Sequence, residues 1–184
     1  MKPLILLLAL SFSAQLSWGQ TFAEKKESRN NKHTAKTGLT RLDPGAVSDR
    51  AQQQFAQDFQ YTSNISWKRE AYYDRVSFTN ANGSRMDAYY DSNARLIGTT
   101  AASSFKEIPS AAQKELSRRY DGCDKAPVLF FDDNSDNDTD MYLYGGHFDD
   151  ADAYFIQLRD KKGKLEIMKI DLEGKVSRFA GVQS

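Results

Sequence analysis

Two stretches of the chain carry an apolar residue at every fourth position, which is the pattern of an amphipathic helix with one buried face. The first follows Ser48, a residue type that caps helix N-termini, and the second opens at Pro109, which the first turn of a helix tolerates well. The apolar positions are Val47, Ala51, Phe55 and Phe59 in the first stretch and Ile108, Ala112, Leu116 and Tyr120 in the second. The numbers of corresponding positions differ by the same offset throughout (108 minus 47 is 61), so we predict two similar helices.

Alternating apolar and polar positions after each helix predict antiparallel strands. In each copy an alternating strand leads to a glycine turn, a second strand follows, and an aspartate turn leads to a third. The matching positions share an offset of 80 in residue number: Val76 and Ile156, Phe78 and Leu158, Gly83 and Gly163, Tyr90 and Ile170, Asp91 and Asp171, and Leu96 and Val176. First strands are expected at 65–68 and 127–131. We therefore predict an α+β fold, a tandem repeat of one helix plus an about four-stranded antiparallel meander, with units at 47–107 and 108–184.

The second unit contains an insertion between its helix and its glycine turn. The strand offset of 80 exceeds the helix offset of 61 by 19, which matches the length of the run from Asp132 to Asp150. This run begins with "DDNSDNDTD" and continues with "MYLYGGHF". We predict an extended hairpin in the second unit, with the acidic residues at its tip, Phe130 and Phe131 leading in and the aromatic run leading out.

The chain begins with the pattern of a secretory signal peptide. Lys2 precedes an apolar block at 4–12, and the small residues Ser17 and Gly19 mark a cleavage site. We expect a signal peptide at 1–19 and a flexible linker at 20–46, which is polar and has no apolar period. No later segment approaches the roughly 20 apolar residues of a membrane-spanning helix, so the expected location is the periplasm or the medium.

Composition and motifs argue against several classes of function. Basic and acidic residues are balanced at 25 each, which favours neither nucleic acid nor an anionic membrane as partner. The single cysteine, Cys123, allows no intramolecular disulfide and is interpreted as a buried thiol, since the chain offers only His33 and His147 as bases. Gly-x-Ser-x-Gly, His-Glu-x-x-His and phosphate-binding glycine motifs are absent. The sequence therefore indicates a protein that is not an enzyme and has no cofactor.

The acidic run suggests two metal hypotheses. Oxygen-bearing side chains at alternate positions suit weak calcium binding, and here they are Asp132, Asn134, Asp136 and Asp138. The EF-hand pattern fails, since position six is Asn137 rather than Gly and position twelve is Leu143 rather than Glu. A zinc site would combine His147 with nearby acids, namely Asp149, Asp150 and Asp152. An ordinary turn is the simpler interpretation of both stretches, because Asp and Asn favour turns for backbone reasons.

Adjacent tyrosines indicate a binding surface. Neighbouring residues of a strand point to opposite faces, so the tyrosine pairs at 72–73 and 89–90 cannot each hide in one core. Tyr90 is expected to face the helix and Tyr89 the open side of the sheet, while Tyr142 and Tyr144 share one face of the predicted hairpin. The partner-binding candidates are Tyr72, Tyr89, Tyr142, Tyr144 and Phe148. The alternative is a hairpin that packs back on the other unit and buries these rings. Trp67 is interpreted as a core residue rather than a contact residue.

Several short motifs occur in an order that resembles a known family. They are Trp67, Tyr73, Val76 and Phe78; Tyr90-Asp91; Leu96 and Thr99; Ile108-Pro109 and Leu116; Tyr120-Asp121-Gly122; and the stretch 155–174. Over 47–179 the chain resembles the beta-lactamase-inhibitor-like, PepSY-like family of exported bacterial proteins. The resemblance implies a tandem helix-plus-sheet architecture with a concave surface, which in the inhibitor grips an enzyme. The chain departs from that inhibitor by lacking its disulfides and by carrying the acidic insertion.

The sequence as a whole predicts a non-catalytic, inhibitor-like binding module for a protein or peptide partner in the envelope or outside the cell. A calcium-responsive structural protein of the envelope is the alternative, and an unrecognised hydrolase is the third hypothesis. The pattern leaves open whether the two predicted sheets are continuous.

Overall fold

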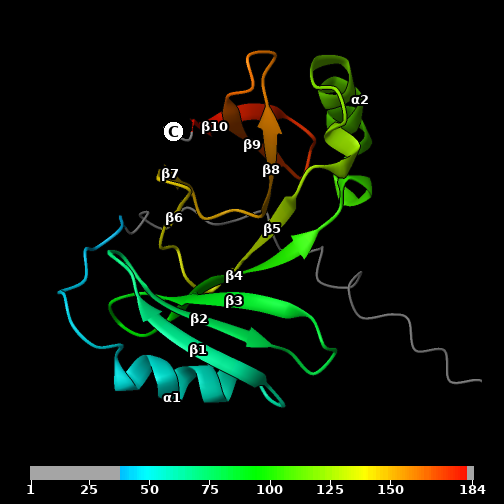
Figure 1. Cartoon of the computed structure of the whole chain (residues 1–184). Coiled ribbons are helices and arrows are strands. Elements are labelled where there is room, and N and C mark those ends of the chain that lie inside the picture. The colour runs from blue at the N-terminus through cyan, green and yellow to red at the C-terminus, as the bar shows by residue number, and fades with distance from the viewer. Residues whose placement is uncertain (1–37, 182–184) are drawn as a thin grey trace, which may run out of the picture. The chain divides into compact units, whose positions relative to one another are not determined.

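The computed structural model describes residues 38–181, and residues 1–37, with the predicted signal peptide and most of the predicted linker, lie outside the described residues together with 182–184 (Figure 1). The helices are α1 (Asp49–Asp58) and α2 (Ser110–Arg119), with the short 3-10 helices η1 (Phe105–Glu107) and η2 (Cys123–Lys125). The strands are β1 (Ser63–Arg69), β2 (Asp74–Thr79), β3 (Arg85–Tyr90), β4 (Leu96–Ser103), β5 (Val128–Asp133), β6 (Met141–Leu143), β7 (Gly146–Phe148), β8 (Ala153–Arg159), β9 (Leu165–Asp171) and β10 (Val176–Gly181). None of the helices between residues 38 and 181 has the length and apolar character to cross a membrane.

One antiparallel sheet of eight strands runs in the order β1-β2-β3-β4-β5-β8-β9-β10. Its two halves are joined at β4 and β5, which pair from Gly98 opposite Asp133 to Ser103 opposite Val128. At Gly98 the packing is tight, since a Cβ atom there would lie 2.6 Å from the main-chain oxygen of Asp132. The predicted α+β class with antiparallel strands is confirmed, and the two predicted meanders share one continuous sheet.

Both helices pack on the same face of this sheet. Residues directly opposite one another in antiparallel strands point to the same face of the sheet. The pairings from β2 to β9 therefore place Val76 in β2 and Met168 in β9 on the same face. The core under α1 contains Ala51, Phe55, Val76, Phe78, Ala88, Tyr90 and Ala94. The core under α2 contains Ile108, Ala112, Leu116, Tyr120, Cys123, Val128, Ile156, Leu158, Met168 and Ile170. The fourfold apolar periods of the sequence therefore mark the buried faces of both helices, and Cys123 is buried as predicted.

The β6–β7 hairpin covers the opposite face of the sheet. Its buried residues Met141, Leu143 and Phe148 belong to one core cluster with Tyr89, Ile97, Phe131 and Phe155. Tyr89 points to the predicted face, away from the helices, but it is only 3% exposed because the hairpin packs there. The hairpin thus packs back on residues of both predicted units, and it buries Tyr89 while leaving Tyr72 and Tyr142 half-buried and Tyr144 exposed.

The prediction that the acidic residues form the tip of an extended hairpin is wrong. β5 pairs with β4 and β8, β6 pairs with β7, and the tip of the β6–β7 hairpin is the Tyr144-Gly145 turn. Residues 132–140, called the acidic loop below, comprise the end of β5 and the segment after it, which packs against the turn between β3 and β4. Its buried members are Asn137, Thr139 and Asp140. The error arose because Asp and Asn are typical of exposed tips, whereas here the side chains of Asn134 and Asn137 hydrogen-bond to the turn between β3 and β4.

The element bounds follow the offsets seen in the sequence. Helices α1 and α2 begin at 49 and 110, which differ by the same 61. Strands β3 and β9 begin at 85 and 165, and β4 and β10 at 96 and 176, an offset of 80 in both cases. Gly83 and Gly163 precede β3 and β9 with the same left-handed φ of +79°, a backbone conformation that L side chains rarely adopt.

Candidate functional site

A cleft of about 330 Å³ lies between the bend that joins β1 to β2 and the tip of the β6–β7 hairpin. Its lining residues are Glu70, Ala71, Tyr72, Tyr73, Arg75, Tyr89, Tyr142, Leu143, Tyr144 and Gly145. Half of these residues are tyrosines, and we call this site the tyrosine cleft. Two segments that are distant in sequence form it, since Tyr73 and Tyr142 meet across a separation of 69 in residue number, so neither segment carries the site alone.

The tyrosines hold the two walls of the cleft together. Tyr73 donates its hydroxyl hydrogen to the main-chain oxygen of Tyr142 at 2.8 Å. The rings of Tyr72 and Tyr142 pack with their centroids 5.0 Å apart, and Tyr73 meets Tyr89 edge to face at 4.9 Å. Edge-to-face and tilted aromatic pairs are favourable beyond the area they bury, so these contacts fix the position of the hairpin over the sheet.

Tyr144 stands at the tip of the hairpin in a strained backbone conformation. Tyr144 and Gly145 have φ values of +50° and +78°, the positive pair of a type I′ turn, in which Asn-Gly is the preferred sequence. A tyrosine there costs roughly 1 kcal/mol relative to glycine or asparagine. The ring is 37% exposed, and its hydroxyl accepts a long hydrogen bond of 3.5 Å from Gln157 Nε2. Strain of this kind is retained where surrounding structure imposes it, and it often marks binding sites.

The charged groups of the cleft neutralise one another. Arg75 contacts Glu70 at 3.4 Å and Asp87 at 3.3 Å, and Lys68 contacts Glu70 at 2.8 Å. All four side chains are partly exposed, so each pair contributes little to stability. The consequence for the cleft is electrostatic, since neither Glu70 nor Arg75 presents an uncompensated charge to a ligand.

Burial keeps the inner tyrosines protonated. Burial is the largest cause that raises the pKa of Tyr73 to about 12, and the nearby Glu70 carboxylate adds to it. Burial also raises the pKa of Tyr89, although its hydrogen bond with Thr100 opposes the shift. The Tyr73 hydroxyl therefore remains a hydrogen-bond donor at every physiological pH.

Four of the five predicted partner-binding residues line the cleft. Tyr72 and Tyr142 are half-buried and Tyr144 is exposed, whereas Tyr89 forms the buried floor. Phe148 lies elsewhere, in the core against the rings of Phe131, Phe155 and Phe179. Sequence reasoning missed Tyr73, Glu70 and Arg75 as site residues. Strand parity indicated the face of Tyr89 but contained no signal for the hairpin that lies over it.

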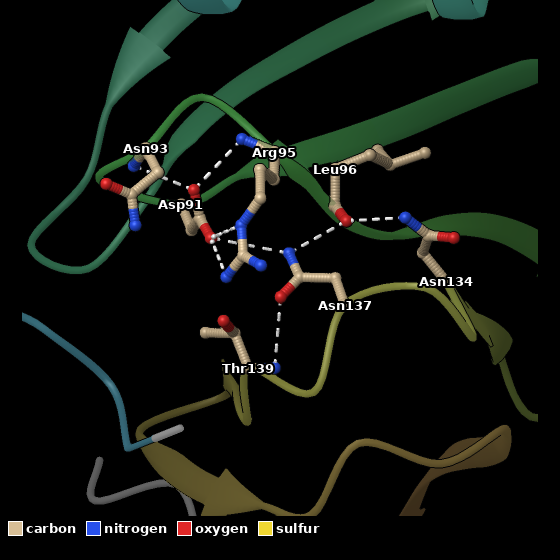
Figure 2. A network of polar contacts seen from close by, with 7 residues as sticks. All are labelled: Asp91, Asn93, Arg95, Leu96, Asn134, Asn137 and Thr139. Carbon is tan, nitrogen blue, oxygen red and sulfur yellow. Dashed lines mark hydrogen bonds and ion pairs between the residues drawn. The ribbon is translucent and has the colours of Figure 1, made fainter. Parts of the chain in front are cut away.

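The acidic loop is fastened to the other half of the sheet by a polar network (Figure 2). The Asn134 and Asn137 side-chain amides donate to the Leu96 carbonyl oxygen, and the donor–acceptor distances are 2.8 and 2.9 Å. Asn137 Nδ2 also contacts Asp91 Oδ2 at 3.4 Å, and its Oδ1 accepts from the main-chain N–H of Thr139 at 3.1 Å. The buried Asp91 carboxylate is further paired with Arg95 at 3.0 Å. The network thus sets the point from which β6 begins.

The base of the hairpin has its own polar contact. His147 Nε2 lies 2.8 Å from Oδ2 of the buried Asp140. Because Asp140 immediately precedes β6 and His147 lies in β7, this contact joins the two strands of the hairpin at their base.

The described residues contain no group of three or more His, Cys, Asp or Glu side chains placed to hold a metal ion. Asn134, one of the proposed calcium ligands, uses both ends of its amide, donating to Leu96 and accepting from the main chain of Asp136. Asp132 and Asp136 are exposed and Asp138 is half-buried. The calcium hypothesis for Asp132, Asn134, Asp136 and Asp138 therefore gains no support from the geometry, nor does the zinc hypothesis at His147.

A second groove, of about 510 Å³, lies on the helix face between α1 and β1. Its apolar lining residues are Phe55, Ala56, Phe59, Tyr61, Ile65 and Trp67. Trp67 packs edge-on against Phe55 at 5.5 Å and is partly buried in the core under α1, in line with its interpretation as a core residue. Tyr61, which is 86% exposed, provides a surface tyrosine outside the tyrosine cleft.

Comparisons with known proteins give a likeness of fold. No protein-family model matches the sequence, and no curated protein matches it. A BLIP-like protein from Bacteroides fragilis aligns with a TM-score of 0.53 at 13% identity, over 77% of this chain and 90% of that one. A proposed periplasmic protein from Bacteroides eggerthii aligns with a TM-score of 0.57 at 13% identity, over 75% and 91%.

A DUF2874 family protein from Bacteroides uniformis aligns with a TM-score of 0.56 at 11% identity, over 74% of this chain and 91% of its own. Identities this low carry the fold alone. The fold of this chain is therefore that of the BLIP-like and DUF2874 family structures, in agreement with the resemblance seen in its motifs.

Proposed function

We propose that the chain is a non-catalytic binding module for a protein or peptide, and that the tyrosine cleft is its recognition surface. The observation that carries the proposal is that Tyr72 meets Tyr142 and Tyr144 around one cleft, although it is distant from them in sequence. All three side chains remain accessible there. Tyrosines are enriched at recognition surfaces because they bring a large contact area at a small cost in side-chain entropy.

The chemistry of the lining supports binding rather than catalysis. Within the described part of the chain, the residues that line the cleft include no Ser, Cys, His or Asp, and their only carboxylate, Glu70, is paired with Arg75 and Lys68. The pKa of Tyr73 is raised to about 12, too far from neutral pH for an efficient general acid or base. A rigid aromatic surface without a reactive pair suits a partner that is held and not transformed.

The fold likeness supports an inhibitor-like mode and a location outside the cytoplasm. One structural neighbour is described as BLIP-like and another as a proposed periplasmic protein. Our proposal for this chain combines these descriptions with the signal-peptide pattern at 1–19.

We further propose that the folded part is a tandem repeat with units at 47–107 and 108–184, the second enlarged by residues 132–150. The two constant offsets support this division, since α1 and α2 begin at 49 and 110 while β3 and β9 begin at 85 and 165. The insertion would then be what builds a cleft on the helix-free face of an otherwise repeated scaffold.

Capture with matched variants tests the function. The full chain would be immobilised and exposed to envelope extract and culture fluid of the source cells, beside the double variant Tyr72→Ala/Tyr142→Ala. The control is Tyr61→Ala, which removes an exposed tyrosine outside the cleft. Point substitutions are preferable to deletion of 132–150, because deletion removes the core residues Met141, Leu143 and Phe148.

The expected result is one protein or peptide that the wild type and Tyr61→Ala hold and the cleft variant releases, with direct binding of the purified pair at least tenfold weaker for that variant. A partner held equally by all three folded proteins would place recognition elsewhere.

A further inference from the structure

We propose that the segment seated in the tyrosine cleft is a neutral, proline-rich stretch in the polyproline II conformation. This inference rests on the proposed function and names the chemistry of the partner. It follows from three features of the cleft: most of its backbone groups are paired within the protein, its side-chain rings are accessible, and its charges are compensated.

Most of the backbone around the cleft is already hydrogen-bonded within the protein. Tyr142 and His147 face each other in the hairpin, and the main-chain oxygen of Tyr142 is taken by the Tyr73 hydroxyl at 2.8 Å. The bend at 70–73 is closed by Glu70 N–H donating to the Tyr73 oxygen, and the Ala71 oxygen accepts from Leu42 N–H. Both strands of the sheet that line the cleft, β2 and β3, are paired on both sides. β6 pairs only with β7, and a strand added at its other edge would have to displace the Tyr73 hydroxyl from the Tyr142 oxygen. Strand addition, the other common way to bind an extended peptide, is therefore disfavoured here.

Recognition therefore falls mainly to side chains, and the available side chains are tyrosine rings. The rings of Tyr72 and Tyr142 are tilted by 52° to one another, and Tyr144 stands exposed on the same hairpin. Aromatic-lined grooves of this composition accept polyproline II segments, whose proline rings pack on aromatic faces. Such a segment has no internal hydrogen bonds, so its carbonyl oxygens are free to accept from tyrosine hydroxyls.

Charge complementarity favours a neutral segment. Arg75 is bracketed by Glu70 and Asp87, and Glu70 is also paired with Lys68, so the two ionic lining residues are already compensated. A charged ligand side chain would have to displace one of these pairs and lose hydration without a new partner. Proline carries no charge and loses little conformational entropy on binding, since its φ is already fixed.

The test is a titration of the full chain with a blocked L-proline hexapeptide, in which binding is measured by calorimetry or by changes in amide chemical shifts. The all-D-proline enantiomer is the control peptide, because it has the same composition and solubility but the opposite helical hand. Tyr72→Leu and Tyr142→Leu remove a ring while keeping an apolar side chain, and Tyr61→Leu is the matched control outside the cleft. Thermal unfolding shows that each variant is folded before binding is measured.

We expect saturable binding of the L-peptide, absent for the D-peptide, at least tenfold weaker in each cleft variant and unchanged in Tyr61→Leu. Equal binding of both enantiomers, no binding at millimolar peptide, or binding insensitive to both cleft variants would overturn the inference. A captured protein partner whose binding depends on the cleft, but which the L-peptide neither mimics nor displaces, would sink the proline assignment and leave the proposed function standing. If neither capture of a protein partner nor binding of the L-peptide depended on the cleft residues, the proline assignment and the proposed function would both be wrong.

Discussion

Tyr73 in the bend before β2 donates its hydroxyl hydrogen to the main-chain oxygen of Tyr142 in β6, 2.8 Å away although the two residue numbers differ by 69. This bond joins the sheet to the hairpin that covers it, and it forms one side of the tyrosine cleft. The cleft therefore depends on the position of a short two-stranded hairpin, and the first three predictions concern what holds or strains that hairpin.

Tyr73→Phe should loosen the hairpin without disturbing the sheet. The substitution keeps the buried ring and its contact with Tyr89 but leaves the Tyr142 oxygen without this donor. We expect a loss of about 1 kcal/mol in the free energy of unfolding, measured by urea denaturation. Amide hydrogen exchange should accelerate in 141–148 more than elsewhere. Uniform acceleration across the sheet would contradict a local role, and Tyr61→Phe serves as the matched control.

Asn137→Ala should loosen the acidic loop, which Asn134 continues to hold against the opposite half of the sheet. Its buried amide donates to Leu96 and contacts the Asp91 carboxylate, so its removal leaves buried acceptors with fewer donors. We expect about 2 kcal/mol lower stability by chemical denaturation. The exposed neighbour Asp136→Ala is the control and should lie within about 0.5 kcal/mol of the wild type. Equal effects of the two substitutions would show that the network contributes nothing specific.

Tyr144→Asn should stabilise the protein while weakening partner binding. Asparagine tolerates the left-handed φ of +50° better than tyrosine and forms the preferred Asn-Gly sequence of a type I′ turn. We expect a gain of roughly 1 kcal/mol in the free energy of unfolding, together with weaker capture of the partner. A variant that gains stability and binds the partner fully would mean that the strain at Tyr144 has no role in recognition.

The protein should lose stability as the pH rises above about 10. Burial raises the pKa of Tyr73 to about 12 and also raises the pKa of Tyr89 and Tyr90 above the ordinary value of 10.0. A pKa raised in the folded state gives stability that is complete below the unfolded pKa and is lost as pH rises toward the folded one. Circular dichroism should therefore lose intensity together with the appearance of tyrosinate absorbance. Ionisation of all tyrosines in a protein that retains its structure would refute the assignment of these rings to the core.

The elements of this fold could be predicted from local patterns because each pattern reports on which face of an element is buried. The fourfold spacing of Ala51 and Phe55 in α1, and of Ala112 and Leu116 in α2, arises because helical side chains at that spacing share a face. The alternation at Val76 and Phe78 likewise identified the buried side of β2. The positions of the glycine and aspartate turns followed from their special backbone conformations.

The path of residues 132–150 could not be predicted, because it depends on contacts that are distant in sequence. The offsets located an insertion of the correct length, yet the acidic composition of 132–140 is the same for an exposed tip and for a loop that bonds to Leu96 and Asp91. Parity placed Tyr89 on the helix-free face but gave no information about what covers that face. Burial there is decided by Met141, Leu143 and Phe148, which pack with residues from several other strands.

The sequence by itself thus determined two helices, the main strands and the opposite faces of Tyr89 and Tyr90, since these depend on residues a few positions apart. The same prediction was wrong for Tyr72 and Tyr73, which lie in the bend before β2 and line the same cleft. Only the tertiary structure decided that the sheet continues through β4 and β5, that the aromatic hairpin folds over it, and that Tyr72, Tyr142 and Tyr144 meet around one cleft. The physical reason is that apolar periodicity specifies the direction in which a side chain points, whereas packing between distant parts of the chain, such as Tyr73 and Tyr142, specifies what it meets.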